Sequence, residues 1–389
     1  MPAGKKFSER LSGPAVTGIL LVLATVLGLG CASTSLAPLY HALLAWVPFP
    51  AFPLTVANWI SEGLMGVFFT TLALEIKHDL LVGPLASPRR AALPLVGAVG
   101  GMAVPGAVAA LCGSAFLNLA GAPALQGWAI PTATDAAFTV PILASLPRIP
   151  GNLRAFLMAL AIFDDLGAIV IMALFYGHSP QLGILAAALV PLLCMGLLAW
   201  RKVPQLWAYL PFTLILWALL LRAGLEPTLA GVVLGFCLPL QSGHRLNRQL
   251  ALPVGLVILP LFAFVSTGVD LRLFTPAFLA AAPFLGPALG LVLGKPLGVC
   301  GAVWGVNRLG LLPAMPGVQG RWLLGMGMVC GIGFTMSLLI ASLAFGGALP
   351  LMQARLGVLA GSLIAALTGW LTLRRACQLS TSSAHSPSG

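Results

Sequence analysis

The chain has 389 residues, of which 59% are hydrophobic and only 7% are charged. Soluble domains carry charge on roughly a quarter of their residues, so this composition excludes an ordinary soluble protein and indicates an integral membrane protein. The net charge of +11 does not indicate nucleic-acid binding, because the Lys and Arg residues form small groups between apolar stretches. The seven cysteines and five histidines show no metal-ligand spacing, so we expect no transition-metal site and no cofactor.

The apolar stretches are long enough for membrane helices, which need about 20 residues each, and they lack the alternation of barrel strands. We therefore predict an all-α polytopic membrane protein with twelve spans. In chain order they cover approximately 14–31, 58–81, 94–119, 123–146, 156–176, 181–200, 205–221, 227–240, a ninth that ends near 268, 286–306, 323–345 and 356–373. We expect the first span to be uncleaved.

The regions outside the spans complete the predicted organisation. Residues 1–13 are predicted to be a cytoplasmic segment, 14–375 a single transmembrane domain, and 376–389 a Ser-rich, disordered cytoplasmic tail. Residues 32–57 contain Pro48, Pro50 and Pro53 and no Lys or Arg, which is typical of an outside loop.

The basic residues predict the orientation of the chain. If the N-terminus is cytoplasmic, only Arg222, Arg272 and Arg355 of the 20 Lys and Arg residues fall on the outer side, and Lys295 falls within a span. This strong positive-inside bias predicts that both termini are cytoplasmic.

Three of the nine acidic residues, Asp135, Asp164 and Asp165, lie in stretches otherwise fit for lipid. Ionised carboxylates at bilayer depth are costly, so they normally face the bundle interior or a wet cavity and mark an ion or proton path. The alternative is structural, since paired charges can hold two membrane helices in register. We interpret the three aspartates as candidate ion-binding and proton-carrying residues.

Lys295 lies well inside the tenth span and needs a carboxylate or carbonyl partner, or must lose its proton. The nearest plausible partners are the aspartates. Adjacent helical residues point about 100° apart, so Asp164 and Asp165 cannot share one task. One can face Lys295 while the other faces Asp135.

Two spans contain residues that favour a break at mid-depth. In the fourth, Pro131 removes a backbone donor and is followed by Thr132, Ala133, Thr134 and Asp135. In the eleventh, Gly331 and Gly333 offer the same chance to unwind, although glycines also serve close helix packing. The two spans hold corresponding places in two possible three-helix repeats, spans three to five and ten to twelve, a pattern typical of transporter binding sites.

A further polar cluster lies near the end of the second span. Glu75 and Asp79 are four residues apart and share a helix face, with His78 close by, and Glu62 lies near the start of the same span. Solvation at the membrane interface explains such a cluster. The alternative hypothesis is a proton-collecting funnel on the inner side.

Five motifs resemble those of the NhaA-type bacterial sodium/proton antiporters, and the similarity covers spans two to twelve. They are residues 129–138 (AIPTATDAAF), 156–169 (FLMALAIFDDLGAI), 258–264 (ILPLFAF), 294–298 (GKPLG) and 330–337 (CGIGFTMS). The association of broken helices in matching repeats with transporter binding sites is itself known partly from this family.

The resemblance implies a fold of inverted-topology repeats with two discontinuous helices that cross at mid-membrane. It implies that Asp164 and Asp165 bind Na⁺ and carry protons, that Thr134 and Asp135 sit at the fourth-helix break, and that Lys295 pairs with Asp164. It places Glu75 and Asp79 toward the inner funnel, and Glu62 has an acidic counterpart in the family. It also implies electrogenic exchange of cytoplasmic Na⁺ or Li⁺ for external H⁺ in the bacterial inner membrane, a role in pH homeostasis and a possible homodimer.

The chain departs from the family at three places. Glu226-Pro227 precedes Thr228 where members often carry a histidine, residues 247–253 (NRQLALP) replace an acidic and histidine-rich segment, and residues 265–267 read VST where ANA is usual. Because of these departures, the resemblance does not imply the family's pH-activation behaviour for this chain. Likewise, the prolines of 32–57 disfavour the outside β-hairpin through which family dimers pair.

Other classes of function predict features different from those of an antiporter. A different cation-coupled transporter, such as a sodium/organic anion symporter, predicts a larger polar pocket with anion-facing residues. An intramembrane enzyme would need DDxxD or GxGD, and residue 168 is alanine where DDxxD requires an aspartate. A passive channel fits less well than exchange, because the expected carboxylate cluster is occluded.

Overall fold

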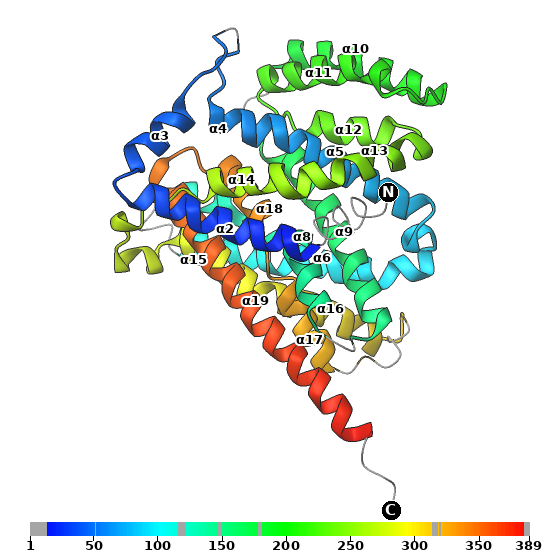
Figure 1. Cartoon of the computed structure of the whole chain (residues 1–389). Helices are drawn as coiled ribbons and strands as arrows, with labels where there is room; N and C mark the ends of the chain where they lie inside the picture. Colours follow the sequence, from blue (N-terminus) through cyan, green and yellow to red (C-terminus); the bar gives the residue numbers. More distant parts are fainter. Residues whose placement is uncertain are drawn as a thin grey trace, which may run out of the picture. The chain divides into compact units, whose positions relative to one another are not determined.

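The computed structural model describes residues 14–50, 52–115, 122–146, 149–177, 181–312, 318 and 320–384, and within these ranges the chain contains helices and no strand. Figure 1 shows these helices coloured along the sequence. The polytopic all-α prediction is therefore confirmed. The predicted cytoplasmic segment 1–13 and the last residues of the tail, 385–389, lie outside the described ranges, as does Arg148.

The described residues contain nine helices that are long and apolar enough to cross a membrane. A tenth span arises if α17 (Gly320–Val329) and α18 (Phe334–Ala344), which are bent by 48° at their junction, count as one. The two remaining predicted spans are not single long helices. The fourth consists of the 3₁₀ helix η3 (Ala122–Thr132) and α8 (Ala136–Ala144), and the eighth is the nine-residue α12 (Leu229–Cys237). The count of twelve stays a prediction.

The chain folds into two compact units, each built from two separate stretches. Unit 1 comprises residues 1–83 and 169–273, and unit 2 comprises 84–168 and 274–389. The sequence did not predict this division, because similar apolar helices build both units. Unit 2 contains both of the predicted three-helix repeats except residues 169–176 at the end of the fifth span.

Unit 1 contains the helices that surround α5, together with the last residues of α9 (Gly151–Phe175). The α-helices are α2 (Pro14–Ser33), α3 (Ala37–Ala45), α4 (Val56–Asn58), α5 (Met65–Leu81), α10 (Leu182–Trp200), α11 (Leu206–Ala223), α12, α13 (Leu240–Pro253) and α14 (Leu259–Ser266). Short π and 3₁₀ segments connect or extend them: η1 (Trp59–Leu64), η4 (Val254–Ile258) and η5 (Leu271–Leu273). The α5 helix packs against α12 and α13, α10 packs against α11, and α2 packs against α14 (Figure 1). Buried Tyr209, Met195 and Leu234 belong to its core.

Unit 2 contains the two interrupted spans. Its helices are η2 (Pro84–Ala86), α6 (Pro88–Ala115), η3, α8, α9 up to Ala168, η6 (Pro276–Ala280), α15 (Ala282–Leu289), η7 (Gly290–Gly294), α16 (Lys295–Arg308), α17, α18 and α19 (Ala348–Ala384). The α6 and α16 backbones come unusually close at two glycines. A Cβ on Gly100 would overlap the carbonyl oxygen of Gly298, and a Cβ on Gly298 would overlap the carbonyl oxygen of Gly100. Small residues allow such close packing of membrane helices. In Figure 1, α19 runs as one long helix beside α15 and α17.

Two expectations about regions outside the spans need correction. The predicted outside loop 32–57 contains α3 (Ala37–Ala45), because Pro38 lies in the first turn of this helix, where proline is tolerated, and the next proline is Pro48. At the other end, α19 continues to Ala384, although a disordered tail was predicted from residue 376. Ala376 and Cys377 are buried, so packing extends the helix past the last basic pair.

Candidate functional site

The fourth predicted span is interrupted immediately before Asp135. The 3₁₀ helix η3 ends at Thr132, just after Pro131, and α8 begins at Ala136. Asp135 is the N-cap of α8: its backbone is extended, and its carboxylate accepts a hydrogen bond from the backbone N–H of Ala137 at 2.9 Å. A carboxylate at this position satisfies an orphan donor and interacts favourably with the positive end of the helix dipole.

The eleventh predicted span is interrupted between α17 and α18. Gly331 and Gly333 lie in the junction, where α18 begins at Phe334. A Cβ on Gly331 would overlap the carbonyl oxygen of Leu291, and a Cβ on Gly333 would overlap the hydroxyl of Ser337. Gly331 therefore allows the backbone at Leu291 to come close, and Gly333 leaves room for the Ser337 hydroxyl.

The two interruptions contact each other through Asp135. Its backbone N–H donates to the carbonyl of Ile332 at 2.6 Å, and its Oδ2 accepts from both the N–H and the hydroxyl of Thr335, at 2.9 and 2.6 Å. Ser337 donates to the carbonyl of Ile130 at 2.6 Å. One buried carboxylate thus receives donors from the start of α8 and from the start of α18. Two helix N-termini compensate its charge.

A second polar cluster forms around Asp164 of α9. The Nζ atom of Lys295 lies 2.5 Å from Asp164 Oδ2, and the hydroxyl oxygen of Thr134 lies 2.6 Å from the same atom. The Thr134 oxygen also lies 2.9 Å from the carbonyl of Cys330, so its single hydrogen can be donated to only one of these acceptors at a time. Asp164 and Lys295 are both 0% exposed. Among the described residues, Asp164 Oδ1 has no hydrogen-bond partner.

Space beside this ion pair depends on α6 and on the start of α16. The π-helical segment η7 ends immediately before Lys295. Opposite it, a Cβ on Gly101 would lie 3.8 Å from Lys295 Nζ, 3.9 Å from Asp164 Oδ1 and 2.8 Å from Val299 Cγ2. Gly101 therefore leaves room beside both charged groups.

Asp165 is also buried, with 5% of its surface exposed. As the neighbour of Asp164 in α9 it projects about 100° away around the helix. The structure therefore assigns Asp164, rather than Asp165, to Lys295. Thr134, Asp164 and Lys295 come together directly, and Asp135 follows Thr134 while binding Thr335.

The predicted funnel residues belong to unit 1. His78 Nδ1 lies 3.1 Å from Asp79 Oδ1, and the His78 ring stacks against that of His244 at 5.8 Å between centroids. Glu75 is exposed on α5, and Glu62 lies in η1, where its backbone carbonyl accepts a hydrogen bond from Trp217. These four residues therefore belong to unit 1, whereas Asp135, Asp164 and Asp165 belong to unit 2.

Sequence reasoning missed several residues that hold the interruptions in place. Thr335 and Ser337 bind the η3–α8 region, and Ser362 of α19 accepts hydrogen bonds from the N–H groups of Gly333 and Phe334 at 3.3 and 3.1 Å. The available signal was a hydroxyl residue in or beside a glycine motif. Such residues are common in membrane helices, so the signal alone is weak.

The arrangement offers oxygen ligands of the kind that hard cations prefer: carboxylates, a hydroxyl and a backbone carbonyl, all from buried residues. It also holds a buried lysine that can compensate a carboxylate when no cation is present. Together with the long apolar helices and two interrupted spans, this defines a polytopic membrane ion transporter.

Comparison with known proteins agrees. The sequence model of the Na+/H+ antiporter 1 family matches residues 8–373, so the chain belongs to this family. It is 42% identical to the Na(+)/H(+) antiporter NhaA 2 of Magnetococcus marinus, over 95% of this chain and 97% of that protein. It is also 42% identical to the Na(+)/H(+) antiporters NhaA of Gluconobacter oxydans, over 96% and 94% of the two chains, and of Vibrio cholerae, over 92% and 94%. The family consists of transporters, and the enzyme alternative is set aside.

Proposed function

We propose that the protein exchanges cytoplasmic Na⁺ or Li⁺ for external H⁺, and that the cation and the protons compete for Asp164 and Asp165. The observation that carries this proposal is the fully buried Asp164, which has an ammonium group and a hydroxyl within hydrogen-bond distance of one oxygen. A charged side chain in the membrane interior costs free energy. A role in transport, in which its charge changes during the cycle, explains why the protein has such a group there.

Competition follows from the chemistry of a desolvated carboxyl group. Burial favours the protonated form of a carboxylic acid, whereas Na⁺, a hard cation, requires ionised and neutral oxygens around it. Thr134 and the carbonyl of Cys330 supply neutral oxygens beside Asp164. In the present arrangement Lys295 occupies one oxygen of Asp164, so an arriving cation displaces the ammonium from that contact. A proton and a cation therefore exclude each other.

Exclusion becomes exchange if the site opens to one side of the membrane at a time and cannot cross while empty and charged. With two carboxylates for each Na⁺, more than one proton returns for each cation expelled, so the exchange is electrogenic and the proton gradient drives it.

We further propose that the protein resides in the bacterial inner membrane with both termini in the cytoplasm and that it serves pH homeostasis. The distribution of the basic residues supports the orientation. The kinship with bacterial Na⁺/H⁺ antiporters supports the membrane and the role.

Everted vesicles that contain the protein test the function. After respiration establishes a pH gradient, added Na⁺ or Li⁺ should dissipate it, as read by dequenching of a pH-sensitive dye. Asp164→Asn and Asp165→Asn should abolish the response, and Asp270→Asn, which alters an aspartate bonded to Arg272 in unit 1, should not. Dequenching that survives both site substitutions would reject the site, and its absence from the wild type would reject the exchange.

A further inference from the structure

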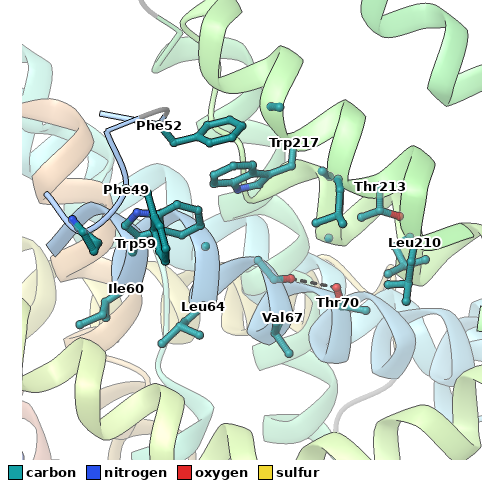
Figure 2. Close-up of a pocket in the computed structure, with 18 of the residues that line it drawn as sticks. Phe49, Phe52, Trp59, Ile60, Leu64, Val67, Thr70, Leu210, Thr213 and Trp217 are labelled. Atoms are coloured by element: carbon teal, nitrogen blue, oxygen red, sulfur yellow. Dashed lines mark hydrogen bonds between the residues drawn. The ribbon is translucent and has the colours of Figure 1, made fainter. Parts of the chain in front are cut away.

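Unit 1 contains an apolar pocket of about 770 Å³ that the ion site does not use. Its walls come from η1 and α5 on one side and from α11 on the other, and α12 and the segment before α4 complete them. Figure 2 shows Phe49, Phe52, Trp59 and Trp217 gathered at one end and Leu210 and Thr213 at the other.

The walls select for hydrocarbon. Among the described residues that line the pocket, none is charged. Its two hydroxyl groups are already committed: Thr70 donates to the carbonyl of Gly66 at 2.9 Å, the dashed line in Figure 2, and Thr213 donates to that of Tyr209 at 3.0 Å. Apolar cavities of this kind bind apolar molecules and exclude water.

The pocket is elongated along the helices. Its lining residues recur every three or four positions on η1 and α5, at Ile60, Gly63, Val67 and Thr70, and again on α11, from Leu210 to Trp217. This spacing marks one stripe on each helix, and the stripe from Ile60 to Thr70 measures about 15 Å at about 1.5 Å per residue. That length is about half of the roughly 30 Å hydrocarbon core, or one leaflet. Both helices belong to candidate membrane spans.

The aromatic end has the properties of a membrane–water interface. Trp59 and Trp217 stack at 5.6 Å between ring centroids, Phe49 meets Trp59 edge-on at 5.9 Å, and the indole N–H of Trp217 donates to the carbonyl of Glu62. Tryptophan is enriched where one side of the ring is apolar and the other is wet. At the other end Leu214 is 64% exposed, so the slot opens toward its surroundings between the helices.

We propose that this pocket holds one acyl chain of a membrane phospholipid, with the aromatic end toward the headgroup region. Lipid is the occupant because membrane spans wall the slot, its length matches one leaflet, and it has one interfacial end and one apolar end. A second copy of this chain would need a protruding apolar segment of the same length. A polar metabolite would find no charge among the described lining residues and one unpaired side-chain donor, the indole N–H of Trp59 at the aromatic end.

Two substitutions fill the slot from opposite walls. A Cβ on Gly66 of α5 would meet nothing within 4 Å, so Gly66→Leu projects into open space, and Ala218→Leu adds bulk from α11. Gly196→Leu is the matched control: Gly196 lies on α10 in the same unit, is exposed, and its added Cβ also meets nothing within 4 Å.

The experiment uses the full chain in nanodiscs made with a phospholipid that carries a photoreactive diazirine near the end of one tail. After irradiation and digestion, mass spectrometry quantifies lipid adducts on the α11 residues of the pocket and on Leu193 of α10, which is 70% exposed. We expect several-fold more adduct in the pocket than at Leu193, a several-fold loss in both filling variants, and no loss in Gly196→Leu.

Pocket labelling no higher than at Leu193 in the wild type would overturn the proposal. So would labelling that survives both filling variants. Monodisperse elution on size exclusion shows that a variant folds. If only one filling variant folds, that variant decides, and if neither folds, the wild-type comparison decides alone.

Discussion

Asp135 and Thr335 lie 200 positions apart in the sequence, yet one oxygen of the Asp135 carboxylate accepts hydrogen bonds from both the backbone N–H and the hydroxyl of Thr335. Because the other carboxylate oxygen accepts from Ala137, a single side chain caps the starts of α8 and α18. The Asp135 side chain therefore joins the two interruptions beside the Asp164–Lys295 pair.

Replacing the shared cap should destabilise unit 2. Asp135→Ala removes both capping interactions and leaves buried donors unpaired, so we expect a loss of about 1 to 3 kcal/mol in the free energy of unfolding. Thr335→Val removes only the hydroxyl bond and should cost less. Thermal unfolding in detergent measures both, and a larger loss for Thr335→Val than for Asp135→Ala would contradict the shared cap.

Removing the charge of Lys295 alone should lower the free energy of unfolding more than removing both charges of the Asp164–Lys295 pair. Lys295→Met leaves the Asp164 carboxylate uncompensated in the membrane interior, and breaking a buried ion pair costs about 3 to 5 kcal/mol. The double variant Lys295→Met/Asp164→Asn removes both charges and should recover most of that loss. The deficit of Lys295→Met should shrink as pH falls, because a protonated Asp164 carries no charge.

Thermal unfolding of the two single variants and the double variant at several pH values tests this coupling. Additive losses, with no recovery in the double variant, would show that the 2.5 Å contact contributes nothing to stability.

Gly101 should control cation access to the ion pair. Gly101→Ala places a methyl group within 4 Å of both Lys295 Nζ and Asp164 Oδ1, so we expect a several-fold rise in the Na⁺ concentration that gives half-maximal transport. Overpacking against Val299 adds a loss of about 1 to 3 kcal/mol in stability. The control is Gly301→Ala on α16, where an added Cβ meets nothing within 4 Å. Equal transport kinetics in the two variants would contradict this role.

Glu226 should make unit 1 less stable as pH rises. It lies in the turn between α11 and α12, where burial is the main cause that raises the pKa of its carboxyl group, although Thr228 donates a hydrogen bond to it at 2.8 Å. A carboxyl group with a raised pKa in the folded state binds more protons than in the unfolded state, so stability falls as pH rises from the unfolded pKa to the folded one.

Glu226→Gln removes this titration and should flatten the dependence of the melting temperature on pH in that window. Asp270→Asn is the control, because Asp270 is ion-paired with Arg272 and its side chain is partly exposed. Parallel profiles for the wild type and Glu226→Gln would contradict the assignment.

The charged residues and the helix interruption of the site can be predicted from the sequence, because such features are rare in membrane-spanning segments. Asp135, Asp164, Asp165 and Lys295 stand out as charges in apolar stretches, and Pro131 predicts an interruption because it removes a backbone donor. The 100° angle between helical neighbours showed that only one of the two adjacent aspartates could face Lys295. It did not show which one, and the 2.5 Å contact assigns Asp164.

The supporting residues could not be predicted from local patterns. Thr368 and Thr335 are both threonines in apolar helices, yet Thr368 donates to Ile364 in its own helix, whereas Thr335 binds a carboxylate 200 positions away. Nothing in their immediate sequence separates the two cases. Gly101 and Ser362 were missed for the same reason, since their roles depend on which distant helix lies opposite.

The half-saturating Na⁺ concentration, measured as a function of pH in proteoliposomes of fixed orientation, tests most directly whether protons and Na⁺ compete for one site. Competition predicts that this concentration rises as pH falls, by about tenfold for each pH unit once one proton must leave for Na⁺ to bind. Asp164→Asn and Asp165→Asn should abolish transport at every pH. A half-saturating concentration that stays constant while only the maximal rate changes with pH would contradict a shared site.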